Sequence, residues 1–141
     1  MPLIEIPFIV GHTYSRNDIY QILNVPNEKR KGNWNTGYNK YNGDWYIFCG
    51  LNTAGRTGHE YENKFIGDDL IWFGNNQSKL SQPSIQSMVK PEGNIFIFTR
   101  EDSNNPYFIY RGNASAKEIY DTIPVKIVWE FNDQRENHPQ K

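Results

Sequence analysis

The stretch from Gly55 to Gly74, GRTGHEYENKFIGDDLIWFG, is the part of the chain from which the rest can be interpreted. It contains a Gly-rich loop, then Tyr61, then a short apolar strand that ends in Trp72-Phe73-Gly74. Tyr61 and Trp72 would be presented from neighbouring segments, with amide and carboxylate side chains between them. Aromatic faces with polar groups beside them suit a flat polar ring, such as a nucleobase taken out of a duplex.

The composition limits the classes of protein that the chain can belong to. Its 141 residues suit one domain with a real core, and we expect a single domain over residues 1–131 followed by a polar tail or linker over 132–141. Aromatic residues make up 15% of the chain against a hydrophobic total of 37%, so they supply much of the burial. The net charge of −1 excludes a uniformly basic surface, and any nucleic-acid site must be a local patch.

The single cysteine and the N-terminal segment bear on the compartment. Cys49 cannot form an internal disulfide, and its apolar neighbours predict a core residue. Met1–Val10 carries an acidic residue and two prolines where a signal peptide would have its charged and apolar regions. No apolar run approaches the roughly 20 residues of a membrane span. We therefore expect a cytoplasmic protein.

Local signals place the helices and strands. Ser15 and Asp18 form a capping-box pattern at the start of a helix that Pro26 ends. Asn42-Gly43 predicts a tight turn. A second short helix is expected at 82–89, a helical turn at 115–120, an edge strand or lead-in at 3–10, and strands at 45–51, 70–73, 94–100, 107–111 and 123–131. These elements predict an α+β fold, a curved sheet or small β-barrel with two or three short helices.

Several motifs follow one another in an order that is found in a known family. Val10–Tyr14 resembles a "VG…Y/W" entry motif, Gly58–Lys64 resembles "GGYEDD", and Asp69–Gly74 resembles "FxYTG". Four further elements fall in the family's order: Gly32–Tyr38, Trp45–Cys49, Gln82–Val89 and Asn94–Thr99. The layout over roughly residues 10–110 resembles the SET-and-RING-associated (SRA) domain, especially the SRA-like modules of modification-dependent restriction endonucleases.

The resemblance implies an SRA/PUA-like fold and a pocket for a flipped modified cytosine, 5-methylcytosine or 5-hydroxymethylcytosine. By position, Tyr61 and Trp72 would stack on its two faces. The family carries a carboxylate three residues after the first aromatic, where this chain has Lys64. The base edge is then left to one of three side chains: Asn63, Asp68 or Asp69. The expected base pocket consists of Tyr61, Trp72, Phe73, Asn63 and Asp69.

The expected DNA contacts come from two loops. Arg56 would contact a phosphate or fill the gap left by the flipped base, and the basic run Lys29–Lys31 would contact backbone phosphates, which position a protein without specifying sequence. The alternatives are a solvated turn for Arg56 and core roles for Trp34, Tyr61 and Trp72. The expected contact residues are Arg56, Thr57, His59, Lys64, Arg30, Lys31, Trp34, Asn35 and Thr36.

Three functions remain open. The first is a recognition module without catalysis or cofactor, which binds double-stranded DNA carrying a modified base and no membrane. It would target a nuclease, such as an HNH nuclease, on the same polypeptide or a partner. The second is a binder of RNA or of unmodified DNA. The third is a small nuclease in which Asp44, Glu62 and Lys64 form a D…ExK arrangement around Mg²⁺. No zinc cluster, P-loop or dinucleotide fingerprint is present in the sequence.

Overall fold

The computed structural model describes residues 7–30, 34, 37–51, 63–75 and 77–132. None of the helices in these ranges is long and apolar enough to cross a membrane. The elements in chain order are β1 (Thr13–Ser15), α1 (Arg16–Leu23), a 3-10 turn η1 (Asn27–Lys29), β2 (Tyr38–Tyr41), β3 (Asp44–Gly50), β4 (Lys64–Ile66), β5 (Asp69–Phe73), α2 (Pro83–Val89), β6 (Ile95–Arg100), β7 (Tyr107–Tyr120) and β8 (Lys126–Phe131).

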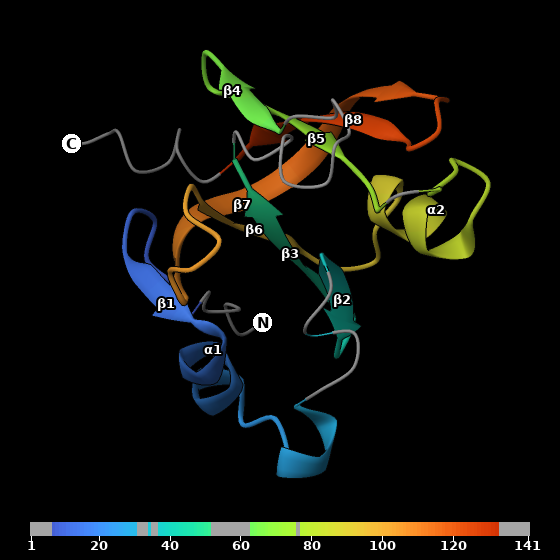
Figure 1. Ribbon diagram of the computed structural model, residues 1–141. Helices are drawn as coiled ribbons and strands as arrows, with labels where there is room; N and C mark the ends of the chain where they lie inside the picture. The colour runs from blue at the N-terminus through green and yellow to red at the C-terminus, as the bar shows by residue number, and fades with distance from the viewer. Residues whose placement is uncertain (1–6, 31–33, 35–36, 52–62, 76, 133–141) are drawn as a thin grey trace.

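The strands form one mixed, curved sheet in the order β2-β3-β6-β7-β8-β5-β4, with β1 added beside β7 (Figure 1). β3 and β6 pair in parallel, and the other described strand pairs are antiparallel. The 14-residue β7 pairs with β6 and then with β8, and its register shifts along both neighbours. Such irregularities bend a strand and increase its twist. The α+β prediction, a curved sheet with short helices, is confirmed, and the architecture is consistent with an SRA/PUA-like fold.

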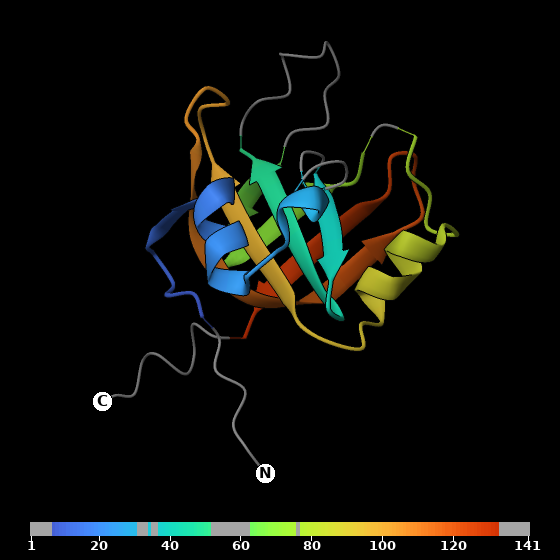
Figure 2. The ribbon, with the colours of Figure 1, turned by 90° about the horizontal axis from the view of Figure 1, so that it is seen from below.

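Both faces of the central strands are buried, in two separate cores. The curved sheet has an inner, concave side and an outer side, and side chains alternate between them along a strand. In β3 the residues of the inner core are Trp45, Ile47 and Cys49, and those of the outer core are Tyr46 and Phe48. The inner core continues into β5 and β8, and α2 packs on it. The outer core is mostly aromatic and is covered by α1, whereas α2 lies at the other side of the sheet (Figure 2).

Phe8 explains how the N-terminal segment joins the outer core. The described part of the expected edge strand, residues 7–10, is not a strand. It is a lead-in whose Phe8 is 5% exposed and meets Phe96, Phe98 and Tyr14 edge-on, with ring centroids 5.7, 5.1 and 5.4 Å away. Edge-to-face contacts of this kind add to the stabilisation that burial alone provides.

The local capping and turn signals are confirmed. Ser15 Oγ accepts a hydrogen bond from the Asp18 amide at 3.1 Å, and an Asp18 carboxylate oxygen accepts one from the Ser15 amide at 2.9 Å. These reciprocal bonds form the capping box of α1. Asn42 and Gly43 join β2 to β3 with φ of 53° and 88°, the two positive values that a tight hairpin turn requires.

Two sequence predictions differ from the structure. Residues 115–120 are not a helical turn. They are the second half of β7 and pair with β8, for example Ile119 with Ile127. Pairing with β8, the next strand along the chain, outweighs local propensity here. The short strands β1, β2 and β4 were not predicted, because three or four residues carry too little alternation to be recognised. Residues 133–141, most of the expected tail, lie outside the described part of the chain.

Candidate functional site

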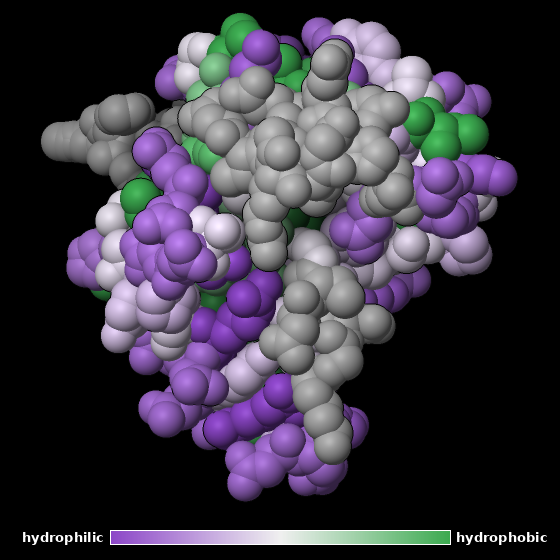
Figure 3. Space-filling view, viewed as in Figure 1, coloured by the Kyte–Doolittle hydropathy of each residue, from purple (hydrophilic) through white to green (hydrophobic). Residues whose placement is uncertain are grey.

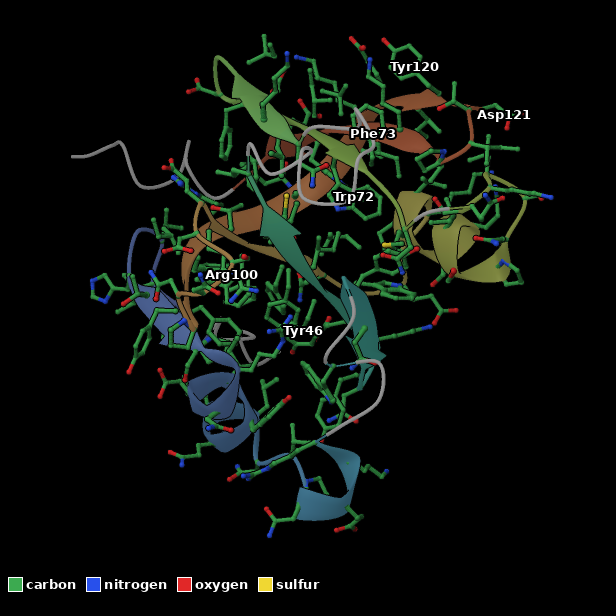
Figure 4. All side chains as sticks on the ribbon, viewed as in Figure 1. Tyr46, Trp72, Phe73, Arg100, Tyr120 and Asp121 are labelled. Carbon is green, nitrogen blue, oxygen red and sulfur yellow. The ribbon has the colours of Figure 1, made fainter. Side chains whose placement is uncertain are left out.

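β5 sends its two neighbouring aromatics to opposite faces (Figure 4). Leu70 and Trp72 are buried in the inner core, whereas Asp69, Ile71 and Phe73 alternate with them and are partly exposed. Trp72 is 2% exposed. Trp72 therefore has the core role that the sequence left as the alternative, and Phe73 belongs to the other face of the strand.

Trp72 is part of an aromatic cluster that joins distant strands. Its ring meets Tyr38 of β2 edge-on at 5.4 Å and lies 6.1 Å from the ring of Trp129 in β8. Tyr38 is the half-buried member of this cluster, and burial raises the pKa of its hydroxyl. The backbone amide of Asn75 donates a hydrogen bond to that hydroxyl at 3.4 Å. We call Tyr38, Trp72 and Trp129 the inner aromatic cluster.

The inner aromatic cluster holds a buried donor. Trp129 is fully buried, and its Nε1 has no hydrogen-bond partner in the part of the chain that the structure describes. A buried N–H without an acceptor costs free energy comparable to a lost hydrogen bond. The side-chain oxygen of Asn75 lies beside Gly37, the residue before Tyr38, and would be 3.1 Å from a methyl group placed there. The cluster thus combines aromatic rings with a donor that no described residue uses.

Asn63 fixes the point where the Gly-rich segment rejoins the sheet. Its side-chain Nδ2 donates to the Gly50 carbonyl at 3.1 Å, and its Oδ1 accepts from the Phe73 amide at 2.8 Å. The side chain therefore ties the end of β3 to the end of β5. These bonds give Asn63 a positioning role, and its predicted contact with a base edge stays a prediction.

The charged candidates of this region lie on the outer side of the β4–β5 hairpin. Asp69 forms an ion pair with Lys117 of β7 at 2.7 Å, and the hydrogen bond with this carboxylate raises the pKa of Lys117. Lys64 pairs with Ile71 and is exposed, and Asp68 is exposed in the hairpin turn. Since residues paired across strands share a face, Lys64 points away from Trp72. The structure thus separates Asp69 and Lys64 from the inner aromatic cluster.

The other predicted contacts divide into three groups. Trp34 is 3% exposed and packs on Tyr20 and Tyr46 at 5.3 and 5.4 Å, so its ring has the core role that the sequence left as the alternative. Arg30 is partly exposed beside α1, with its guanidinium 5.6 Å from the centre of the Tyr20 ring. The residues that lie outside the described ranges are Tyr61, Arg56, Thr57, His59, Lys31, Asn35 and Thr36.

The geometry argues against the D…ExK arrangement. Asp44 is the first residue of β3, and it accepts hydrogen bonds from Asn94. Lys64 follows Asn63, which is bonded to Gly50 at the far end of the same strand. Six residues of a strand span about 20 Å, which is too far for Asp44 and Lys64 to serve one metal ion. Among the described residues, no three His, Cys, Asp or Glu side chains form a group that could hold a metal.

Comparisons with known proteins can be set beside this geometry. Residues 8–134 match the sequence profile of a family described as a domain of unknown function, DUF3427. The chain belongs to this family. The DUF3427 fold seen here is similar to the solved structure of the DNA modification-dependent restriction endonuclease AspBHI, with a TM-score of 0.54. The match covers 88% of this chain and 73% of that chain at 14% sequence identity, a level that shows the fold alone. A comparison with curated protein sequences finds no relative.

Sequence reasoning missed several residues of this DUF3427 domain that the fold brings together. Tyr38 is one, and the short strand that positions it was not recognised. Arg16 and Arg100 are two others, which meet beside α1 although 84 positions separate them in the chain. A basic residue directly after a helix N-cap, where acidic residues are favoured, was the signal available for Arg16.

Proposed function

We propose that this domain is a DNA-recognition module that takes a modified base, 5-methylcytosine or 5-hydroxymethylcytosine, into the inside of its curved sheet. The module has no catalysis of its own and directs a nuclease on the same polypeptide or a partner to modified DNA. The motif order that resembles SRA domains and the fold shared with a modification-dependent restriction endonuclease both support this function. The fold likeness is an analogy, since one fold hosts many functions.

The observation that carries the proposal is the inner aromatic cluster with its unpartnered indole N–H. A flipped base needs aromatic surface for its faces and hydrogen-bonding groups for its edge. Tyr38 is half-buried and offers ring surface, whereas Trp72 and Trp129 are buried. In this proposal the cluster opens to admit the base, and Trp72 then offers a second ring and Trp129 Nε1 a donor for a base carbonyl oxygen. Stacking contributes roughly 1–3 kcal/mol per base, which is comparable to the few kcal/mol that unpairing costs.

In this proposal Tyr61 supplies the second stacking face, and Asn63 holds the segment that carries it. Tyr38 is the half-buried ring of the cluster, so it is the first that an entering base meets. The base edge is read by Trp129 together with Asn63 or a residue of the 52–62 segment. Lys64 acts from the outer face, where it contacts a phosphate of the DNA backbone, whereas Asp69 is held there by its ion pair with Lys117.

The deciding experiment is fluorescence anisotropy with otherwise identical duplexes that carry cytosine, 5-methylcytosine or 5-hydroxymethylcytosine, at about 0.15 M salt to weaken nonspecific phosphate binding. We expect tighter binding to a modified duplex, and we expect Tyr61→Ala and Tyr38→Ala to remove the preference. Tyr41→Ala is the matched control, because Tyr41 lies on the same strand but packs on the outer core.

Equal affinity for the three duplexes would refute modification recognition and favour sequence-specific DNA binding. Binding to single-stranded RNA that exceeds binding to every duplex would favour the RNA alternative. Cleavage of any of these nucleic acids that requires Mg²⁺ and is lost in the Asp44→Ala or Lys64→Ala variant would favour the nuclease alternative and overturn the absence of catalysis.

A further inference from the structure

Three arginines from distant parts of the chain line one cavity beside α1. The cavity has a volume of about 450 Å³, within the range of ligand sites in proteins. Arg16 comes from the first turn of α1, Arg30 follows η1, and Arg100 ends β6. None of the residues that line the cavity is acidic, and they are Ser15, Arg16, Asn17, Tyr20, Arg30, Arg100, Ser103, Asn104 and Pro106. We call this cavity the arginine pocket.

Backbone carbonyls and aromatic rings hold the three guanidinium groups in place. Arg16 Nε donates to the Trp34 carbonyl at 2.8 Å, and Arg30 Nε donates to the Val25 carbonyl at 2.7 Å. Arg100 donates from a terminal nitrogen to the Asn105 carbonyl at 2.6 Å. Because Arg16 and Arg30 use Nε for these bonds, their terminal amino groups remain for a ligand. A preorganised guanidinium loses little conformational entropy when it binds.

Two of the guanidinium groups of the pocket lie close together. Arg16 and Arg100 lie over the same ring, that of Phe108, with guanidinium carbons 5.1 and 4.4 Å from its centre. Burial and the neighbouring Arg100 lower the pKa of Arg16. Like charges that share a half-buried site repel each other, and a bound anion would relieve this repulsion. Figure 3 shows strongly hydrophilic surface in the region of α1 and η1.

The position of the pocket relates it to the inner aromatic cluster. Arg100 pairs with Gly50 in the parallel β3–β6 ladder, and its carbonyl accepts a hydrogen bond from the Leu51 amide at 2.8 Å. Gly50 is also the residue that Asn63 holds. The arginine pocket and the root of the 52–62 segment are therefore neighbours at one end of the sheet. Figure 4 shows Arg100 on the α1 side, away from Tyr120 and Asp121.

We propose that the arginine pocket binds a backbone phosphate of the DNA whose base enters the inner aromatic cluster. Guanidinium groups bind phosphate oxygens through paired hydrogen bonds, and the Ser103 and Asn104 side chains offer further donors. This inference rests on the proposed function for the identity of the polymer. The pocket itself would hold a phosphate group whether or not a modified base is recognised. Its contribution is the same for every base sequence, because phosphates carry no sequence information.

The test compares Arg16→Gln, Arg30→Gln and the double variant with Lys90→Gln. Lys90 follows α2 on the other side of the sheet and is exposed, so this control removes the same charge elsewhere. We expect each arginine variant to bind modified and unmodified duplexes about tenfold more weakly. We expect the slope of log K against log salt to fall by about 0.9 per lost phosphate contact. Lys90→Gln should change neither quantity.

The results of this test distinguish the arginine pocket from the proposed recognition of a modified base. Loss of affinity with an unchanged ratio between modified and unmodified duplexes supports the arginine pocket alone, whatever that ratio is. An unchanged salt slope in the double variant, with a folded protein by circular dichroism, overturns the inference.

A second measurement follows amide resonances of Ser15–Asn17 and Ser103–Asn104 during titration with inorganic phosphate. Shifts in the wild type that vanish in the double variant support a phosphate site. Such shifts without any binding of duplex DNA would assign the pocket to a small phosphorylated molecule and refute its role in DNA binding. If these amide resonances shift neither with inorganic phosphate nor with duplex DNA, the arginine pocket does not bind phosphate groups.

Discussion

Tyr38 and Trp72 hold the two ends of the sheet together. They belong to β2, at one edge of the sheet, and to β5, next to the other edge, and their rings meet at 5.4 Å with an interplanar angle of 71°. No strand pairing joins β2 to β5 in the described chain. The curl is therefore closed by side chains rather than by a hydrogen-bonded ladder, and the closing residues are those of the proposed base site.

Replacing Tyr38 should weaken the contact between β2 and β5 and destabilise the folded protein. Tyr38→Ala removes the ring that covers Trp72 and should lower the free energy of unfolding by about 2–4 kcal/mol, as for a partly buried aromatic. Tyr38→Phe keeps the ring and loses only the hydroxyl that accepts from Asn75, so its cost should stay near 1 kcal/mol. Urea denaturation measures both, and equal losses in the two variants would show that the ring contact does not close the sheet.

Asn63→Ala should remove the side-chain link between the ends of β3 and β5. The substitution leaves the Phe73 amide and the Gly50 carbonyl without their side-chain partner, which costs about 1–3 kcal/mol when these groups are shielded from water. Hydrogen exchange at the Phe73 amide should become faster. Lys64→Ala, at the next position and exposed, is the control. If exchange at Phe73 is the same in the two variants, Asn63 does not anchor this strand end.

Trp129→Phe tests the buried donor directly. The indole N–H has no partner among the described residues, so its removal should lower the free energy of unfolding by less than a Trp-to-Ala change, about 1–2 kcal/mol from lost packing. If the donor binds a flipped base, affinity for the modified duplex should fall about tenfold, the effect of one hydrogen bond, while affinity for the unmodified duplex is unchanged. Equal effects on both duplexes would place Trp129 outside base recognition.

Gly93→Ala should destabilise the hairpin between β2 and β3. A methyl group at this position would collide with the Gly43 carbonyl oxygen and the Asp44 carboxylate, and the Gly43 backbone cannot give way easily in a tight turn. We expect a loss of about 1–3 kcal/mol. Gly67→Ala is the comparison, because that position has φ of +60° but open space around it, so it reports backbone strain without collision. A smaller loss at Gly93 than at Gly67 would contradict this account.

Cys49 should be chemically inert in the folded protein. Burial raises the pKa of its thiol to about 12, against about 8.5 for an exposed cysteine. The folded state then holds its proton more tightly than the unfolded state, so this group's contribution to stability is present below pH 8.5 and is lost as pH rises toward 12. Thiol labelling at pH 8 should be negligible until urea unfolds the chain. Rapid labelling of the native protein would show that the thiol is accessible.

The sequence by itself determined the elements whose causes are local. The Ser15–Asp18 capping box starts α1, and Asn42-Gly43 makes the hairpin turn, because each acts over at most three residues. Continuous apolar runs predicted β3 and β6 and the burial of Cys49, and alternating apolar side chains predicted β8. The α+β class followed from these elements. The motif order indicated the family resemblance without any knowledge of how the chain packs.

Only the tertiary structure decided which residues meet. Residues 115–120 became strand because β8 offers a partner, and Trp34 went into the outer core because α1 and β3 enclose it. One cavity is lined by Arg16, Arg30 and Arg100, and the ring of Tyr38 contacts that of Trp72. Both arrangements depend on the curvature of the sheet, which local propensity does not determine. Contacts between residues far apart in sequence depend on the twist and closure of the whole sheet, since every strand between them must add its own rotation.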